Sequence, residues 1–221
     1  MKTLLKVKGI LLDLDGTIVD SREAYFEAAR TALAAMGQTV PDSEIVTEIP
    51  KRLEQDMPIH DLIPAVARER AKRFQEVYLK TYYQATMTRT KPFPHAAETL
   101  KQLSMKAKLA LTTRRNVPMA VVIEELERFG LAKYFHCIMT SLDTQNPKPS
   151  PEALMICSRR LNVGIPLCLV VGDSVVDVRA GKNAGARTAA VLSGIFTRDE
   201  LEKEKPDLIL ENINELPGFL E

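Results

Sequence analysis

Two pairs of aspartates follow short apolar runs, with spacings that suit metal or phosphoryl chemistry. Asp13 and Asp15 leave the first of these runs, and Asp173 and Asp177 leave another. The four-residue spacing of the second pair places both carboxylates on one face of a starting helix. Close carboxylates repel each other unless a cation or a shared proton offsets their charge, and oxygen-only acidic ligands suit Mg²⁺. The alternative for each pair is ordinary capping of a turn or a helix N-terminus.

A lysine and two threonines are candidates for binding an anion beside these carboxylates. Lys148 lies in a loop with prolines at 147, 149 and 151, which would keep its ammonium group near a fixed point. A solvated loop lysine is the alternative. Thr112 and Thr113 end another apolar run, where a hydroxyl can bind a phosphate oxygen. Gly16, directly after Asp15, allows the backbone to approach a ligand closely.

The elements that must position these residues alternate between short apolar strands and helices. We expect strands near 7–12, 109–113, 137–140, 167–172, 188–192 and 208–210. This alternation predicts an α/β fold with a parallel sheet covered by helices on both faces, and such a sheet gathers its polar residues at the carboxyl ends of the strands.

One long stretch interrupts the alternation. Residues 20–87 have a charged, helical pattern, and no strand is evident among them. The aromatic residues at 74, 78 and 82 have helical spacing, which favours a packed interior. We therefore expect an α/β core made of residues 1–19 and 88–221, with residues 20–87 inserted as an all-helical cap domain.

Composition limits the partners and the location. The 221 residues include 30 Lys and Arg against 29 Asp and Glu, so no basic excess indicates nucleic acid. No apolar stretch approaches the length of a membrane span, and the first residues do not resemble a signal peptide. Three cysteines without paired spacing favour small core residues in a reducing compartment. We expect a cytoplasmic monomer or homodimer without nucleic-acid or membrane partners.

Taken in order, these segments resemble the four motifs of the haloacid dehalogenase-like hydrolase superfamily. The resemblance rests on the acidic segment 13–17, a strand-end threonine, Lys148 with its following proline, and the segment 172–177. It runs from about Lys8 to Ile195 and is similar to the members with a small helical cap of the C1 type, in the phosphoglycolate phosphatase and β-phosphoglucomutase-like branch. It implies a Rossmann-like parallel core with the cap inserted after the first motif.

The resemblance also implies catalytic roles. Asp13 would be the nucleophile that forms an aspartyl-phosphate, and Asp15 would be the general acid and base. Lys148 and a threonine would hold the phosphoryl oxygens. Alignment on the apolar residues 109–111 favours Thr113 for this position, and alignment on residues 114–116 favours Thr112. Both are kept.

A metal site is implied as well. Mg²⁺ would bind the Asp13 carboxylate, the Asp15 backbone carbonyl and Asp173, with Asp177 close by or acting through water. Gly16 would bring its backbone to the phosphate.

Substrate choice would come from the cap as it closes over the site. Lys51 and Arg52 could reach a carboxylate or a second phosphate of the substrate, although exposed helix charges are the alternative for both. Arg114 stands where many relatives have a small polar residue, and it is a further candidate for substrate contact.

The predicted function is a magnesium-dependent phosphatase for a small phosphorylated metabolite, with phosphoglycolate as the leading candidate. One alternative is a phosphosugar mutase of the β-phosphoglucomutase type, but Tyr25 stands where those mutases carry a histidine. The other is a non-catalytic binding module on the same fold. The presence of Asp13 and Lys148 gives that module no support.

Overall fold

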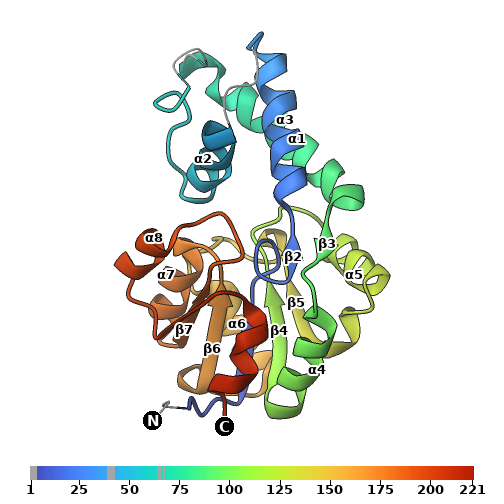
Figure 1. Ribbon diagram of the computed structural model, residues 1–221, viewed down its shortest axis with the longest axis vertical. Coiled ribbons are helices and arrows are strands. Elements are labelled where there is room, and N and C mark those ends of the chain that lie inside the picture. The colour runs from blue at the N-terminus through green and yellow to red at the C-terminus, as the bar shows by residue number, and fades with distance from the viewer. Residues whose placement is uncertain (1–3, 39–42, 64–65, 67) are drawn as a thin grey trace. The chain divides into compact units, whose positions relative to one another are not determined.

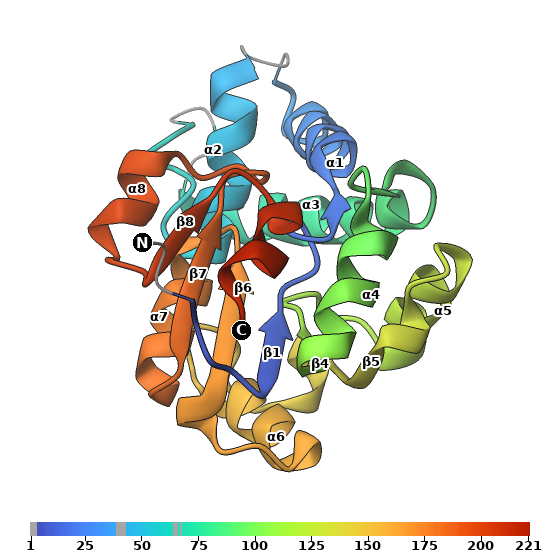
Figure 2. The same cartoon turned by 60° about the horizontal axis from the view of Figure 1, so that its bottom comes forward.

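The computed structural model describes residues 4–38, 43–63, 66 and 68–221, and its main feature is a six-stranded sheet. The strands of the chain are β1 Gly9–Leu12, β2 Val19–Asp20, β3 Lys91–Pro92, β4 Lys108–Thr112, β5 Phe135–Met139, β6 Cys168–Gly172, β7 Arg187–Val191 and β8 Leu208–Leu210. The order in the sheet is β5-β4-β1-β6-β7-β8, and every neighbouring pair is parallel (Figure 2). The remaining strands, β2 and β3, form a separate antiparallel pair.

Helices cover both faces of this sheet, as the alternation predicts. The helices are α1 Arg22–Ala35, α2 Ser43–Glu54, α3 Arg68–Arg89, α4 Ala96–Lys106, α5 Met119–Arg128, α6 Glu152–Leu161, α7 Val175–Ala184 and α8 Arg198–Lys203 (Figure 1). Helices α4 and α5 and the C-terminal 3₁₀ helix Ile213–Phe219 pack on one face, and α6 and α7 pack on the other. The Rossmann-like α/β fold is thereby confirmed.

Burial on both faces explains why the central strands are uniformly apolar. All four residues of β1 and all five residues of β6 are buried. Ile10 and Leu12 join the cluster beneath α4 and α5, whereas Leu11 joins the cluster beneath α6 and α7. A strand covered on both faces needs apolar side chains at every position rather than at alternate ones.

The strand order places the carboxyl end of β1 beside a change in winding direction. Numbered along the chain, the six strands follow the order 3-2-1-4-5-6, in which the chain winds outward from β1 in both directions. Ligands of such sheets bind in the crevice outside the strand ends at this switch point. The chain leaves β1 at Asp13 and leaves β6, the neighbour across the switch point, at Asp173. Topology therefore brings both acidic motifs to the same edge.

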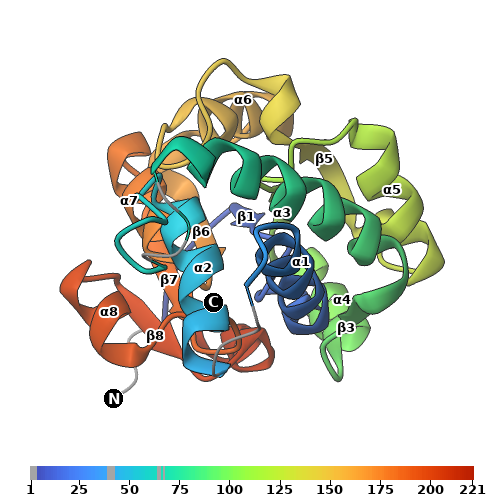
Figure 3. The ribbon, with the colours of Figure 1, turned by 90° about the horizontal axis from the view of Figure 1, so that it is seen from above.

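Contacts divide the chain into two compact units. One unit contains the residues up to Asp20 and from Lys91 onward, and the other is Ser21–Thr90. Within the second unit, which we call the cap, α1 packs against α3 (Figure 3). Alanines on the buried face of α1 let α3 approach closely, and they pack with rings from α3. The buried rings of α3 are Phe74, Tyr78 and Tyr82.

Several smaller expectations can be compared with the structure. The three cysteines are unpaired and buried, with the sulfur atoms of Cys137 and Cys157 3.4 Å apart. The strands β2 and β3 and the helix α8 were not expected, because a two-residue strand shows no alternation and α8, with the sequence RDELEK, has a single apolar residue. Within the described part of the chain, every helix is too short or too polar to cross a membrane.

Candidate active site

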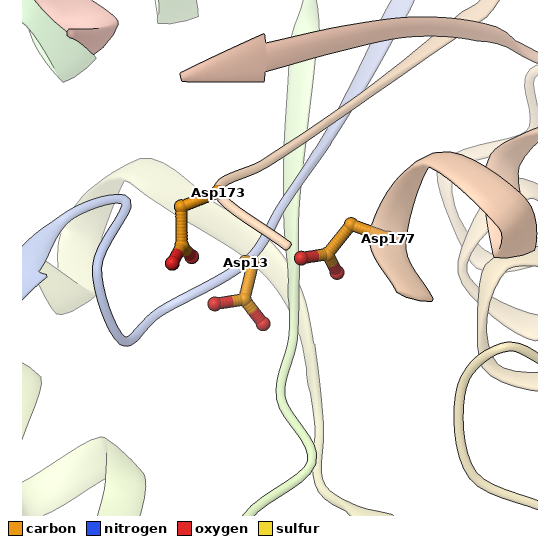
Figure 4. Close-up of side chains that lie close together, drawn as sticks. All are labelled: Asp13, Asp173 and Asp177. Carbon is orange, nitrogen blue, oxygen red and sulfur yellow. The ribbon is translucent and has the colours of Figure 1, made fainter. Parts of the chain in front are cut away.

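Three buried carboxylates face one another at the carboxyl edge of the sheet (Figure 4). Asp13 follows β1, Asp173 follows β6, and Asp177 lies in the first turn of α7. One carboxylate oxygen of each lies within 4.8 Å of the others, and all three residues are buried. The Thr17 hydroxyl donates a 3.2 Å hydrogen bond to Asp173. Among the described residues, this cluster has the donor set of a metal site.

Asp177 serves the helix and the cluster at the same time. Ser174 is the N-cap of α7, and its hydroxyl donates a 2.8 Å bond to Oδ2 of Asp177. The backbone N–H of Asp177 donates in return to the Ser174 hydroxyl, at 3.4 Å. This capping box leaves Oδ1 of Asp177 directed into the cluster. Asp177 therefore caps the N-terminus of α7 and also belongs to the acidic cluster.

Three glycines make room for the cluster. A Cβ on Gly16 or Gly194 would overlap the carboxylate of Asp173, and a Cβ on Gly172 would overlap that of Asp177. Gly16 also has φ +76°, a conformation that favours glycine. The backbone therefore fits closely around the two carboxylates. Gly194, in the loop after β7, is a contributor that the sequence motifs did not identify.

The ammonium group of Lys148 lies among these carboxylates. It donates to Oδ1 of Asp13 at 2.8 Å, to Oδ1 of Asp177 at 2.6 Å and to the backbone carbonyl of Thr112 at 2.8 Å. Burial by itself lowers the pKa of Lys148, but the charges of Asp13 and Asp177 raise it above its ordinary value. Arg114 donates to the backbone carbonyl of Lys148 and so helps to hold this loop. Lys148 therefore carries a fixed positive charge at the site.

The charge of the cluster is only partly balanced. Three carboxylates meet one ammonium group, so the ionised cluster retains negative charge that a divalent cation can offset. Burial raises the pKa of Asp13 to about 7, Lys148 opposes the rise, and the charges of Asp177 and Asp15 add to it. Donors that are all carboxylate oxygens suit a hard cation such as Mg²⁺ or Ca²⁺. The residues present therefore fit a metal ion.

The two candidate threonines differ in their surroundings. The Thr112 hydroxyl is buried and has no hydrogen-bond partner among the described residues. The Thr113 hydroxyl accepts a 3.2 Å bond from the backbone N–H of Arg115 and keeps its own proton available as a donor. A buried polar atom without a partner is uncommon and is typical of functional sites. Both hydroxyls remain candidates for binding a phosphoryl oxygen.

The Asp15 side chain lies outside the acidic cluster and is paired with Arg115, and metal binding by the Asp15 backbone carbonyl stays a prediction. Its two carboxylate oxygens accept from Nη2 and Nε of Arg115 at 2.6 and 2.7 Å, and Glu125 of α5 accepts from the same guanidinium. All three residues are buried. Sequence reasoning did not single out Arg115 or Glu125. The available signal was a glutamate on the apolar face of α5, next to the buried Leu126.

The two cap residues that were considered for substrate binding have partners within the cap. Lys51 lies 3.0 Å from the Glu48 carboxylate, and Arg52 donates a 2.9 Å bond to the backbone carbonyl of Pro58. Contact between these side chains and a substrate stays a prediction.

Comparison with known proteins gives both family and fold. A family model described as haloacid dehalogenase-like hydrolase matches residues 10–191. The phosphoglycolate phosphatases of Escherichia coli (strain K12) and Shigella boydii serotype 4 (strain Sb227) are each 30% identical to this chain over 232 residues. Each match covers 95% of this chain and 91% of the relative.

Solved structures share the fold over nearly their full length. A haloacid dehalogenase-like family hydrolase from Streptococcus pneumoniae matches with a TM-score of 0.82 at 18% identity, covering 97% of this chain and 98% of that one. A hydrolase from Pseudomonas syringae matches with a TM-score of 0.72 at 23% identity, covering 96% of both chains.

Proposed function

This chain belongs to the haloacid dehalogenase-like hydrolase family, and we propose that it is a magnesium-dependent phosphatase that hydrolyses a small phosphomonoester through an aspartyl-phosphate on Asp13. The observation that carries this proposal is the cluster of Asp13, Asp173 and Asp177 around the Lys148 ammonium group. A dianionic phosphate can approach several carboxylates only where cations offset their charge. Lys148 supplies one such cation.

Asp13, Asp173 and Asp177 would hold the Mg²⁺. When bound there, the ion supplies further positive charge beside the phosphate and polarises a phosphoryl oxygen. The Lys148 ammonium orients the Asp13 carboxylate through its 2.8 Å bond and remains close to any phosphoryl group that Asp13 receives. The Thr112 or Thr113 hydroxyl and the backbone at Gly16 would donate to the other phosphoryl oxygens.

The chemistry has two steps, and Asp15 acts in both. In the first, an oxygen of the Asp13 carboxylate attacks phosphorus and the bond to the leaving oxygen breaks; that oxygen takes a proton from Asp15. In the second, a water oxygen attacks the same phosphorus while Asp15 takes the proton of the water. The bond between phosphorus and Asp13 then breaks, which releases phosphate and restores the Asp13 carboxylate and the protonated Asp15.

Phosphoglycolate is the leading substrate. Relatives with this activity in their name are 30% identical and match nearly the whole chain. Phosphoglycolate carries a carboxylate besides its phosphate, so its recognition needs a basic group away from the reacting phosphorus. Lys51, Arg52 and Arg114 are the candidates for this contact. The expected class of partner is therefore a small phosphorylated metabolite, and the expected location is the cytoplasm.

The residue at the position of the mutase histidine favours hydrolysis over mutase chemistry. The Tyr25 ring stacks on Tyr82 with centroids 5.0 Å apart and ring planes 6° from parallel. Tyr25 is thus a partly buried residue that packs against the cap interior, and a phenol offers no proton acceptor comparable to imidazole near neutral pH.

Phosphate release from a panel of phosphomonoesters tests the proposed function. The panel contains phosphoglycolate, sugar phosphates, nucleotides and pyrophosphate, each assayed with Mg²⁺ and again with EDTA. We expect release that requires Mg²⁺ and is concentrated on one small ester. No release from any compound by a folded, Mg²⁺-binding protein would contradict the proposal. Interconversion of sugar phosphates without net release would instead establish the mutase.

A further inference from the structure

We propose that Arg115, held in place by Glu125, is a positioning residue that fixes the Asp15 carboxylate for proton transfer, an inference that rests on the function proposed above. The three side chains form a chain of contacts that runs from α5 through the loop after β4 to the loop after β1. None of the three side chains lies in the cluster of carboxylates that could hold a metal ion.

The Arg115 guanidinium meets Asp15 edge to edge. Nε donates to Oδ2 at 2.7 Å, and Nη2 donates to Oδ1 at 2.6 Å. Two parallel bonds from a planar fork fix the plane of the carboxylate as well as its distance, which a single bond does not. Because the two residues are 100 positions apart, the pair also joins two separate loops of the site.

Glu125 fixes the guanidinium from another side. Its carboxylate accepts from Nη1 of Arg115, with a second and longer contact of 3.5 Å to Nη2. Residue exposures of 3% for Arg115 and 5% for Glu125 leave little room for other conformations. Arg115 is therefore attached to α5, and α5 packs on the sheet.

Stability alone is a poor reason for such an arrangement. Buried ion pairs often contribute no more than well-packed apolar side chains of similar volume, because burying charge costs free energy. Here two carboxylates and one guanidinium are buried together, and each has lost most of its contact with water. Arg115 and Glu125 are better explained as residues that hold the Asp15 carboxylate in a fixed orientation.

Proton transfer by Asp15 depends on the direction in which its carboxylate is held. Each of its oxygens accepts one hydrogen bond from the guanidinium, so both ends of the carboxylate are fixed. A general acid must point one oxygen at the leaving oxygen within hydrogen-bond distance, so loss of orientation lowers the rate of proton transfer. In this account Arg115 acts through Asp15 and does not touch the phosphate.

Leaving-group dependence separates this role from a purely structural one. Arg115→Lys keeps the positive charge but loses the fork, and Arg159→Lys, at an exposed position of α6, is the matched control. We expect Arg115→Lys to lower kcat/KM about 10- to 100-fold for an alkyl phosphomonoester, whose leaving oxygen needs a proton. For p-nitrophenyl phosphate, whose leaving group departs without protonation, we expect a loss within about threefold. Arg159→Lys should change neither value.

Glu125→Gln is the second variant, and Glu124→Gln on the exposed side of the same helix is its control. This variant should also lower kcat/KM more for the alkyl ester than for p-nitrophenyl phosphate, but by a smaller factor than Arg115→Lys. If thermal unfolding shows that Arg115→Lys does not fold, Glu125→Gln tests the positioning role in its place. Equal losses on both esters, or no loss on either, would overturn the role of Arg115 while wild-type turnover upholds the phosphatase. Failure of the wild type to release phosphate from any ester would overturn both.

Discussion

The two units of this protein bury different kinds of side chain. The α/β core encloses charged groups that face one another, among them Asp13, Lys148 and Arg115. The interior of the cap consists of alanines, larger aliphatic side chains and aromatic rings, with Phe74 and Tyr78 stacked at 6.3 Å between centroids. Lys51 is the one charged side chain among its described buried residues. Buried charges cost free energy unless they are well paired, whereas buried rings stabilise the fold directly. The difference indicates that the core accepts the free-energy cost of buried charges in order to form the site, whereas most of the cap interior stabilises the fold.

The largest expected effect comes from removing the buried cation of the core. Lys148→Met would leave Asp13 and Asp177 facing each other without their shared ammonium group. We expect kcat/KM for the best phosphomonoester to fall about 1000-fold, because a donor directed at developing phosphoryl charge is lost. Lys101→Met, at an exposed position of α4, is the control. Activity within tenfold of wild type would show that Lys148 is a structural residue only.

The next effect concerns the space around the carboxylates. Gly194→Ala places a Cβ on the Asp173 carboxylate and must displace it. We expect the Mg²⁺ concentration for half-maximal activity to rise about 10- to 100-fold, as for other disturbances of the residues behind a metal ligand. Gly164→Ala is the control, since its added Cβ would meet only Pro166, at 3.9 Å. An unchanged Mg²⁺ requirement in the Gly194 variant would remove Asp173 from the proposed metal site.

A smaller effect follows from the raised pKa of Asp13. Burial raises this pKa to about 7, so the metal-free folded protein holds a proton on Asp13 below that pH. A cation must displace this proton, and its affinity should therefore fall as pH decreases from 8 to 6, by up to about tenfold per unit below the pKa. Calorimetric titration with Mg²⁺ in buffers of different protonation enthalpy measures both the affinity and the proton release. A Mg²⁺ affinity that does not change between pH 8 and pH 6 would contradict the raised pKa of Asp13.

The smallest effect on activity is expected in the cap. Phe74 is fully buried in α3, and Phe74→Leu should lower the free energy of unfolding by about 1 kcal/mol through imperfect packing. Phe26→Leu on α1, where the residue is 38% exposed, should change this free energy by less than about 0.5 kcal/mol. Both variants should retain kcat for p-nitrophenyl phosphate within about twofold while folded. A large loss of kcat without unfolding would mean that the cap interior takes part in the chemistry.

The same contrast explains what could be predicted from sequence. The core motifs are local, and each joins a buried strand to a turn, so their spacing was enough to predict the sheet and the convergence of Asp13 with Asp173. Arg115 and Glu125 gave no such signal, because the partner that explains them, Asp15, is about 100 residues away in sequence and comes close only in the folded chain.

Other features depended on tertiary fit. Gly194 lies against Asp173 only because β7 runs beside β6, so its closeness to that carboxylate is a property of the sheet. The cap showed helical periodicity, which predicted that Phe74, Tyr78 and Tyr82 would form its interior. Periodicity carries no information about which basic cap side chain meets a ligand, and for this reason substrate contacts of Lys51 and Arg52 stay predictions.

The central claim is that Asp13 accepts the phosphoryl group. To test this, wild-type protein is mixed with a phosphomonoester that is labelled in its phosphate, and the reaction is quenched in acid within the first turnover. The protein is then digested, and the labelled peptide is identified by mass spectrometry. We predict label on the peptide that contains Asp13, bound to that carboxylate, and no label in Asp13→Asn, which should also be inactive. Label on another residue, or continued turnover by Asp13→Asn, would contradict the account.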